Sequence, residues 1–283
     1  MNRLESVSLV ASCANSEDPF KLLEHEVSKL TSNGVGGQLL SCGIIPERFS
    51  HDSSEEKLWA KYCDILLNRS FNILGIESEV IRVRGDSADI RGVTEEYSIV
   101  GDAKAFRLSR TAKNQKDFKV TALNDWRRND TYACLVGPLY QYPNRSSQIY
   151  EQAEEHNVTL LSYVHVRFLL DHAANEKLER IWNVARSLSP QKDARRYWEA
   201  VDDEIVAITA TSYDELRSYK QMEINEIHAV GLQEISYWES VKKGHHELSR
   251  EDAIRRLIRA EKIDQKIEVI RKSMDRVSRA LNG

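Results

Sequence analysis

The chain has 283 residues, of which 41% are hydrophobic and only 5 are proline, so it can bury a substantial core and is not a disordered tail. Its formal net charge of −4 argues, taken alone, against a polyanionic partner, although net charge does not show how the charges are arranged. No stretch approaches the roughly 18 apolar residues of a membrane span, and nothing in the sequence directs export. The four cysteines are scattered without a CxxC pair, which argues against a zinc site and predicts reduced core thiols in a cytoplasmic protein.

The first predicted element is a helix over residues 53–74, which starts with a capping box formed by Ser53 and Glu56 and ends before a glycine. Three short segments with strand character and turn sequences between them come next, over residues 79–83, 89–93 and 97–103. On this assignment Asp89 and Asp102 lie on neighbouring strands.

A second helix is expected over residues 115–127, because Phe118, Leu123 and Trp126 share one face while lysines can point away from it. A buried strand, a helix and another buried strand should follow, over residues 132–136, 146–156 and 158–163. The order helix, three strands, helix, strand predicts an α/β core with a mixed β-sheet and flanking helices.

The C-terminal part of the chain is expected to be helical, because strand signals stop at about residue 193. Ser249 and Asp252 make a second capping box. Apolar residues then recur at alternating steps of three and four as a heptad seam: Ala260, Ile263, Ile267, Ile270, Met274, Val277 and Leu281. We expect three parts: a partly helical segment over 1–50, a catalytic core over 51–190, and a helical region over 191–283 for dimerisation or DNA clamping.

Asp89, Asp102 and Lys104 together form a D…(D/E)xK pattern. Two carboxylates at adjacent strand edges can bind Mg²⁺, which prefers oxygen ligands. Lys104 should project to the same face of its strand as Asp102, where an ammonium group can orient water and stabilise charge on a phosphate. The pattern favours metal-dependent phosphodiester cleavage. Alternatively, the acids are ordinary turn or strand-end residues and Lys104 is a solvated lysine.

Glu56 is a candidate for a further metal ligand, because a helix that leads into the sheet can deliver a carboxylate from outside the strands. The alternative is that Glu56 only completes the capping box with Ser53. Asp64 on the same predicted helix is a second, less favoured candidate.

A basic segment follows the motif: residues 102–128 hold eight lysines and arginines against three aspartates. Amides lie among these cations, and amides can pair with adenine while arginine and lysine contact guanine or phosphates. We therefore expect DNA contacts, although a solvated charged face is the alternative. The candidate residues are Arg107, Arg110, Lys113, Asn114, Gln115, Lys116 and Lys119.

The histidines offer no competing site. His165 and His172 flank a predicted helix without acids at metal-ligand spacing, and we expect both, like the pair His245 and His246, to be surface residues. The sequence has no P-loop, GxGxxG or nucleophile-elbow motif.

The motif segment DAKAFRLSRTAKNQKDFKV, together with the WR at Trp126 and the QYP at Gln141, resembles the HindIII-type restriction endonucleases. Weaker similarity lies in EEKLWAKYCDILL and RGDSADI and reaches forward to about Leu161. The resemblance covers a little over a third of the chain, and the ends match poorly. It implies the PD-(D/E)xK restriction-endonuclease fold, with Asp89 and Asp102 as metal ligands and Lys104 as the catalytic lysine.

The same resemblance implies a Mg²⁺-dependent type II enzyme, with Mn²⁺ able to substitute, that works as a homodimer and cuts the palindrome AAGCTT after its first adenine. It also implies 5′-phosphate and 3′-hydroxyl ends and a DNA methyltransferase as functional partner. Two alternatives stay open. One is a cleavage-inactive, sequence-specific DNA-binding protein, and the other is an RNA-directed or repair nuclease without a strict site.

Overall fold

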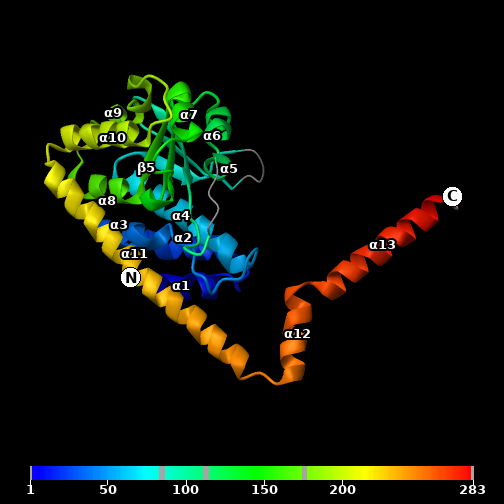
Figure 1. Ribbon diagram of the computed structural model, residues 1–283. Helices are drawn as coiled ribbons and strands as arrows, with labels where there is room; N and C mark the ends of the chain where they lie inside the picture. Colours follow the sequence, from blue (N-terminus) through cyan, green and yellow to red (C-terminus); the bar gives the residue numbers. More distant parts are fainter. Residues whose placement is uncertain (1, 83–86, 111–114, 174–176, 282–283) are drawn as a thin grey trace. The chain divides into compact units, whose positions relative to one another are not determined.

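The computed structural model describes residues 2–82, 87–110, 115–173 and 177–281 (Figure 1). Two compact units divide the chain, Met1–Leu232 and Gln233–Gly283. Among the described residues, no helix combines the length and the apolar composition that crossing a membrane requires. The three-part division expected from the sequence stays a prediction.

The first unit begins with four helices whose starts are capped by the polar side chains that precede them. Ser53 caps the longest, because its Oγ accepts a hydrogen bond from the backbone N–H of Glu56 at 3.2 Å. The expected helix over 53–74 is thereby confirmed to within a residue at each end. The four helices are α1 (Arg3–Cys13), α2 (Pro19–Ser28), α3 (Ser32–Cys42) and α4 (Ser54–Ile73).

A five-stranded mixed sheet follows, with its strands in sequence order. Neighbouring strands pair antiparallel from β1 to β3 and parallel from β3 to β5, so β3 belongs to both halves of the sheet. Helix α4 packs against β1, β2 and β3. This arrangement confirms the predicted α/β class. The strands are β1 (Glu77–Val80), β2 (Ile90–Val93), β3 (Ser98–Ala103), β4 (Tyr132–Gly137) and β5 (Val158–Ser162).

The helix expected over residues 115–127 is broken in two, into α5 (Gln115–Phe118) and α6 (Val120–Arg127). Lys119 lies between them with a φ of 48°, in the left-handed region. Phe118 and Val120 are both buried, each 1% exposed. Since side chains two positions apart lie on nearly opposite sides of a helix, one continuous helix could not bury both, and the break at Lys119 resolves the conflict.

Several helices complete the first unit and surround the parallel half of the sheet. Helices α6 and α7 pack against β5, and α9 packs against β4 and β5. Helix α11 continues beyond the first unit. The helices are α7 (Gln148–His156), α8 (Tyr163–His172), α9 (Leu178–Trp182), α10 (Ala194–Thr209) and α11 (Tyr213–His246), with short 3₁₀ turns at Leu139–Gln141 and Ala185–Ser187.

The prediction that His165 is a surface residue is wrong, because its side chain is fully buried. His165 lies in the first turn of α8, where Nδ1 meets the backbone N–H and Oγ of Ser162. Its Nε2 lies 3.1 Å from Asp202, which also pairs with Lys220. Burial lowers the pKa of His165 despite this acid. The partner acid is 37 residues away in sequence, which is why local spacing did not show it.

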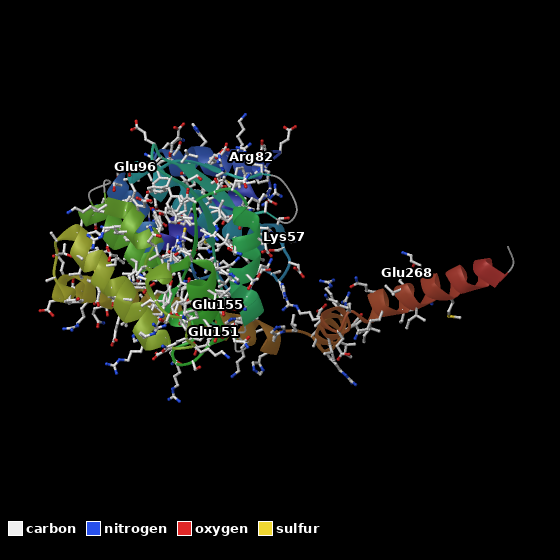
Figure 2. The ribbon with its side chains drawn as sticks, turned by 90° about the horizontal axis from the view of Figure 1, so that it is seen from above. Lys57, Arg82, Glu96, Glu151, Glu155 and Glu268 are labelled. Atoms are coloured by element: carbon white, nitrogen blue, oxygen red, sulfur yellow. The ribbon has the colours of Figure 1, made fainter. Side chains whose placement is uncertain are left out.

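The core of the first unit is shared by the N-terminal helices and the sheet, since Val10, Leu39, Tyr62 and Leu135 belong to one buried cluster. All four cysteines are free and buried, as the sequence predicts. Charged side chains project from the surface around this core, among them those of Lys57, Arg82, Glu96 and Glu155 (Figure 2).

The second unit contains the end of α11 and the helices α12 (Arg250–Ala260) and α13 (Ile263–Leu281). Ser249 caps α12, as its sequence predicts, because Oγ accepts from the N–H of Asp252 at 3.1 Å. The heptad seam is not carried by one helix, since the chain turns at Lys262, with a φ of 55°. Ile267, Ile270 and Met274 are between 42% and 64% exposed, so these seam positions face solvent in the single chain.

Candidate active site

The end of β3 carries a buried carboxylate, that of Asp102. It is 1% exposed, and within the described residues the one donor that meets it is an ammonium group. The group that meets it is the ammonium of Lys104, whose Nζ lies 2.5 Å from Oδ2 in an ion pair. The backbone N–H of Lys104 donates to the carbonyl of Val136 at 2.7 Å, which holds Lys104 to the sheet just past the end of β3. The two side chains meet, as strand alternation predicts.

Asp89 lies close to Asp102. Ile90 pairs with Gly101 in the antiparallel ladder between β2 and β3, and Asp89 comes one residue before Ile90. The backbone N–H of Asp89 donates at 3.2 Å to the carbonyl of Gly101, the residue before Asp102, and the charge of Asp89 acts on Asp102. The side chain of Asp89 is 30% exposed, whereas that of Asp102 is almost wholly covered. One carboxylate is therefore open to solvent and the other is buried behind it.

The environment of Asp102 raises its pKa to about 6. Burial is the largest cause, because it disfavours the charged form, and the neighbouring charge of Asp89 acts in the same direction. The ammonium of Lys104 opposes both effects without cancelling them. A carboxylate so poorly compensated would gain from a further positive charge, and such groups concentrate at functional sites.

Helix α4 brings a third carboxylate, that of Asp64, into electrostatic contact with Asp89 and Asp102. Asp64 is 3% exposed, and burial raises its pKa well above the usual range, with further contributions from Asp89 and Asp102. Lys61, one helical turn earlier, places its Nζ 3.0 Å from Oδ2 of Asp64 and 2.6 Å from Oδ1 of Asp89. The sequence offered one signal for Asp64, namely its place within a run of residues that are otherwise apolar, from Tyr62 to Leu67.

Glu56, the favoured helix candidate from the sequence, lies in a different environment. Its carboxylate accepts from the guanidinium of Arg107 at 2.7 Å and from the backbone N–H of Asp52 at 2.7 Å, and it meets His51 at 3.2 Å. Eight residues separate Glu56 from Asp64, which is about 12 Å along a helix axis. The structure therefore brings Asp64, and not Glu56, into electrostatic contact with Asp89 and Asp102.

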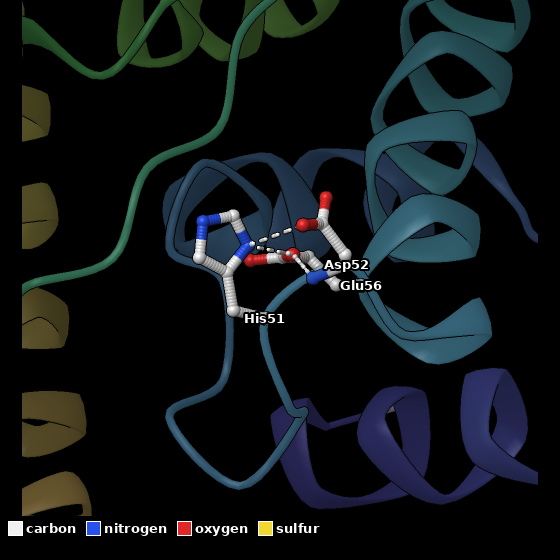
Figure 3. A group of neighbouring side chains, drawn as sticks. All are labelled: His51, Asp52 and Glu56. Atoms are coloured by element: carbon white, nitrogen blue, oxygen red, sulfur yellow. Dashed lines mark hydrogen bonds and ion pairs between the residues drawn. The ribbon is translucent and has the colours of Figure 1, made fainter. Parts of the chain in front are cut away.

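His51, Asp52 and Glu56 form a small cluster of their own at the start of α4 (Figure 3). Potential ligand atoms of the three residues lie within 4.8 Å of one another. His51 and Asp52 are more than 80% exposed, and Glu56 is already neutralised by Arg107. Ion pairing and capping of α4 account for this cluster without a metal ion.

Arg107, the first cation after Lys104, bonds to other residues of the protein. Its side chain is 18% exposed, and besides Glu56 it donates to the backbone carbonyls of Pro46, Glu47 and Phe49. Two residues later, the N–H and Oγ of Ser109 donate to the buried carboxylate of Glu47 at 3.0 and 2.8 Å. These bonds tie the beginning of the basic segment to the loop before α4.

The other residues predicted to contact DNA are either more exposed than Arg107 or lie outside the described residues. Arg110 pairs with Asp117 at 2.5 Å and lies over the ring of Phe106, and Lys119 lies over the ring of Trp126. The structure does not describe Lys113 and Asn114, nor the side chains of Gln115 and Lys116. Arg110 and Lys119 therefore stay candidates for contact with a polyanion, since a guanidinium or ammonium group near the surface can exchange its present partner for a phosphate.

The donor set at the end of β3 suits a hard divalent cation. Such ions take oxygen ligands, preferably from carboxylates, and carboxylates are offered by Asp64 on α4, by Asp102 on β3 and by Asp89 just before β2. Among the described residues, the feature that fits a ligand role best is the carboxylate of Asp102, which is buried and has a single ammonium as its donor. Lys104 then stands beside the ligands as a second source of positive charge.

Comparison with known proteins gives two agreeing findings. A family model described as HindIII restriction endonuclease matches residues 4–274. The type II restriction enzyme HindIII of Haemophilus influenzae is 36% identical over 278 residues, covering 93% of this chain and 92% of that protein. The family match thus runs from residue 4 to residue 274, well beyond the third that carries the visible motifs.

Proposed function

The chain belongs to the HindIII restriction endonuclease family and is a type II site-specific deoxyribonuclease; from this premise we propose that it makes Mg²⁺-dependent double-strand cuts in DNA at the palindrome AAGCTT. Cleavage would follow the first adenine and leave 5′-phosphate and 3′-hydroxyl ends. The observation that carries the cleavage chemistry is the buried carboxylate of Asp102, which pairs with the ammonium of Lys104 and lies within reach of the charge of Asp89.

Asp89, Asp102 and Asp64 would hold the metal, with Mn²⁺ able to replace Mg²⁺. A bound divalent ion supplies Lewis acidity, polarising the phosphoryl oxygen and lowering the pKa of a bound water. The protein residues do the remaining work. Lys104 donates hydrogen bonds from Nζ to the attacking water or to the phosphate oxygen on which charge develops, and its partner Asp102 fixes where that nitrogen lies. We propose no ligand role for Glu56 at this centre, because Arg107 already occupies its carboxylate.

The basic segment would hold the DNA next to this centre, since its cations resume at Arg107, three residues after Lys104. We assign contacts with phosphates and bases to Arg110, Lys113, Asn114, Gln115, Lys116 and Lys119. Arg107 takes a different role: its guanidinium anchors the segment to the loop before α4. Different residues of the segment therefore contact the DNA and anchor the segment to the protein.

A homodimer is the assembly that fits a palindromic target, because a two-fold axis presents the same segment to each half-site. The helices around Trp238 and the seam from Ile263 to Leu281 would help to build the dimer or brace the DNA. Exposed apolar side chains at Ile267, Ile270 and Met274 support this assignment. We place the protein in the cytoplasm, where reduced thiols persist and a partner DNA methyltransferase would protect the host sites.

Incubation with plasmid DNA and Mg²⁺ tests the proposal, followed by sequencing of the fragment ends. Discrete fragments that begin with 5′-phosphorylated AGCTT are expected, and none in EDTA. Cognate binding without fragments would instead identify a cleavage-inactive DNA-binding protein. A smear would identify a nuclease without a strict site. Discrete ends at another sequence would overturn the AAGCTT assignment alone.

A further inference from the structure

One ammonium group stands between two carboxylates of the candidate metal site. Nζ of Lys61 lies 2.6 Å from Oδ1 of Asp89 and 3.0 Å from Oδ2 of Asp64. The two acids come from different elements, Asp64 from α4 and Asp89 from the start of β2, so Lys61 bridges the helix and the sheet. It therefore contacts carboxylate oxygens that a divalent cation would also require.

The charge balance shows why a cation is held there. Asp64, Asp89 and Asp102 bring three carboxylates together, and Asp64 is almost wholly buried. Lys104 compensates Asp102, and Lys61 compensates the other two. Without Lys61, two carboxylates would face each other with no positive charge between them, and like charges repel more strongly in a protein interior than in water.

The side chains of Asp64 and Lys61 differ in how far they can move. Asp64 is fixed by burial within α4, whereas the side chain of Lys61 is 39% exposed on a flexible four-carbon stem. The lysine can therefore leave by rotating toward solvent, while the carboxylate stays in place. This combination is suited to exchange of one cation for another.

We infer that Lys61 is a resident counterion of the metal site: it holds Asp64 and Asp89 together when the site is empty and is displaced from them when a divalent metal binds. The inference rests on the proposed function, because it assumes a metal at these carboxylates. Lys61 is a positioning residue in this assignment, not a catalytic one. By competing for Asp64 and Asp89 it lowers the affinity of the DNA-free enzyme for metal.

The opposite role makes the opposite prediction. If Lys61 instead oriented the carboxylates for coordination, its removal would loosen them and weaken metal binding. The sign of the change in metal affinity therefore separates the two roles, and it can be measured without DNA and without turnover.

The test is titration of the full-length, DNA-free protein with Mn²⁺, following the electron paramagnetic resonance signal of free Mn²⁺. Lys61→Met should bind Mn²⁺ about tenfold more tightly than the wild type, and Lys61→Arg, which keeps the charge, should stay close to the wild type. Lys57→Met is the matched control, because Lys57 lies one turn earlier on α4 with its side chain at the surface (Figure 2). It removes the same charge from the same helix and should leave the affinity unchanged.

Thermal unfolding of the same proteins gives a second readout. In EDTA, Lys61→Met should melt below the wild type, because Asp64 and Asp89 then repel each other, and Mn²⁺ should raise its melting temperature by more. If Lys61→Met does not fold, Lys61→Gln replaces it in both measurements. Equal or weaker Mn²⁺ binding by the variant that lacks the charge, with the wild type binding metal normally, would overturn the role of Lys61 alone. If neither protein binds Mn²⁺ at any concentration, the proposed metal site and the inference fall together.

Discussion

Nζ of Lys104 lies 2.5 Å from Oδ2 of Asp102, where β3 leaves the sheet. The pairing follows from the alternation of side chains along a strand, which sends residues two apart to the same side. It also follows from the hydrogen bond between the Lys104 N–H and the Val136 carbonyl, which keeps the chain in register with β4 beyond the last residue of β3. A carboxylate that would bind metal and an ammonium that would stabilise phosphate charge are thereby held together.

Replacing Lys104 with alanine should lower the cleavage rate by at least about 100-fold, because the phosphate loses the ammonium that stabilises its developing charge. Affinity for the same DNA should change little, since the basic segment remains. Single-turnover cleavage and gel-shift assays on one duplex measure the two quantities. A loss of binding as large as the loss of cleavage would contradict the role given to Lys104.

The comparison of Asp64→Asn with Glu56→Gln decides which acid of α4 serves the metal. Asp64→Asn should raise the Mg²⁺ concentration needed for half-maximal cleavage by about tenfold or more, because a charged ligand is lost next to Asp89. Glu56→Gln should leave that concentration almost unchanged, because Glu56 is bound to Arg107. Cleavage measured over a range of Mg²⁺ concentrations gives both values. The reverse result would restore Glu56 as the ligand.

The case of these two acids shows what the sequence could predict and what it could not. Glu56 and Asp64 lie on the same predicted helix, and spacing alone did not show which of them faces the sheet. That choice depends on how α4 packs against β1, β2 and β3, which is a tertiary property. Asp89, Asp102 and Lys104 could be brought together from local pattern, because strand alternation and a short hairpin determine their separation.

Long-range pairing explains the other differences. Composition groups Arg107 with the DNA-contacting cations, but its partners Glu47 and Glu56 lie 60 and 51 residues earlier in the chain. Local spacing places His165 at the surface because its partner Asp202 lies 37 residues away in sequence. The break at Lys119 arises because Phe118 and Val120 must both be buried, a demand that no helical periodicity expresses. Local sequence signals predict where the helices and strands lie. The environment of individual side chains depends on partners from distant segments.

The protonation of Asp102 predicts a pH-dependent stability. Its pKa in the folded protein is raised from 3.8 to about 6, so the folded state favours the neutral form. The stability that protonation provides is fully present below about pH 4 and is lost as the pH rises through 6. Asp102→Asn mimics the neutral form at every pH. In EDTA its free energy of unfolding should therefore be nearly that of the wild type at pH 4. At pH 8 it should exceed that of the wild type by about 2 kcal/mol.

Urea unfolding of both proteins across this pH range measures the difference. Asp117→Asn is a suitable control, because Asp117 pairs with Arg110 away from the metal site, and its variant should show no gain in stability at high pH. A gain for Asp102→Asn that is the same at pH 4 and pH 8 would show that the carboxylate charge is not the cause. Mg²⁺ should stabilise the wild type more than Asp102→Asn, because the variant lacks a ligand.

Arg107 and Arg110 should respond differently to substitution although both belong to the basic segment. Arg107→Ala removes donors from the carboxylate of Glu56 and from three backbone carbonyls, and it should lower the free energy of unfolding by roughly 2 kcal/mol. Arg110 is more exposed, with a side chain that is 38% accessible, and it pairs with Asp117 near the surface, so Arg110→Ala should cost at most about 1 kcal/mol.

DNA binding should show the complementary pattern. Arg110→Ala should reduce the slope of affinity against salt concentration by about one unit if Arg110 contacts a phosphate, because one fewer counterion is released. Arg107→Lys keeps the charge but cannot reproduce the fork of hydrogen bonds to Glu56 and the carbonyls of Pro46 and Glu47, so it should be destabilised and keep the wild-type salt slope. A reduced salt slope for Arg107→Ala would mean that Arg107 leaves its internal partners to contact DNA, and the anchoring role would then be wrong.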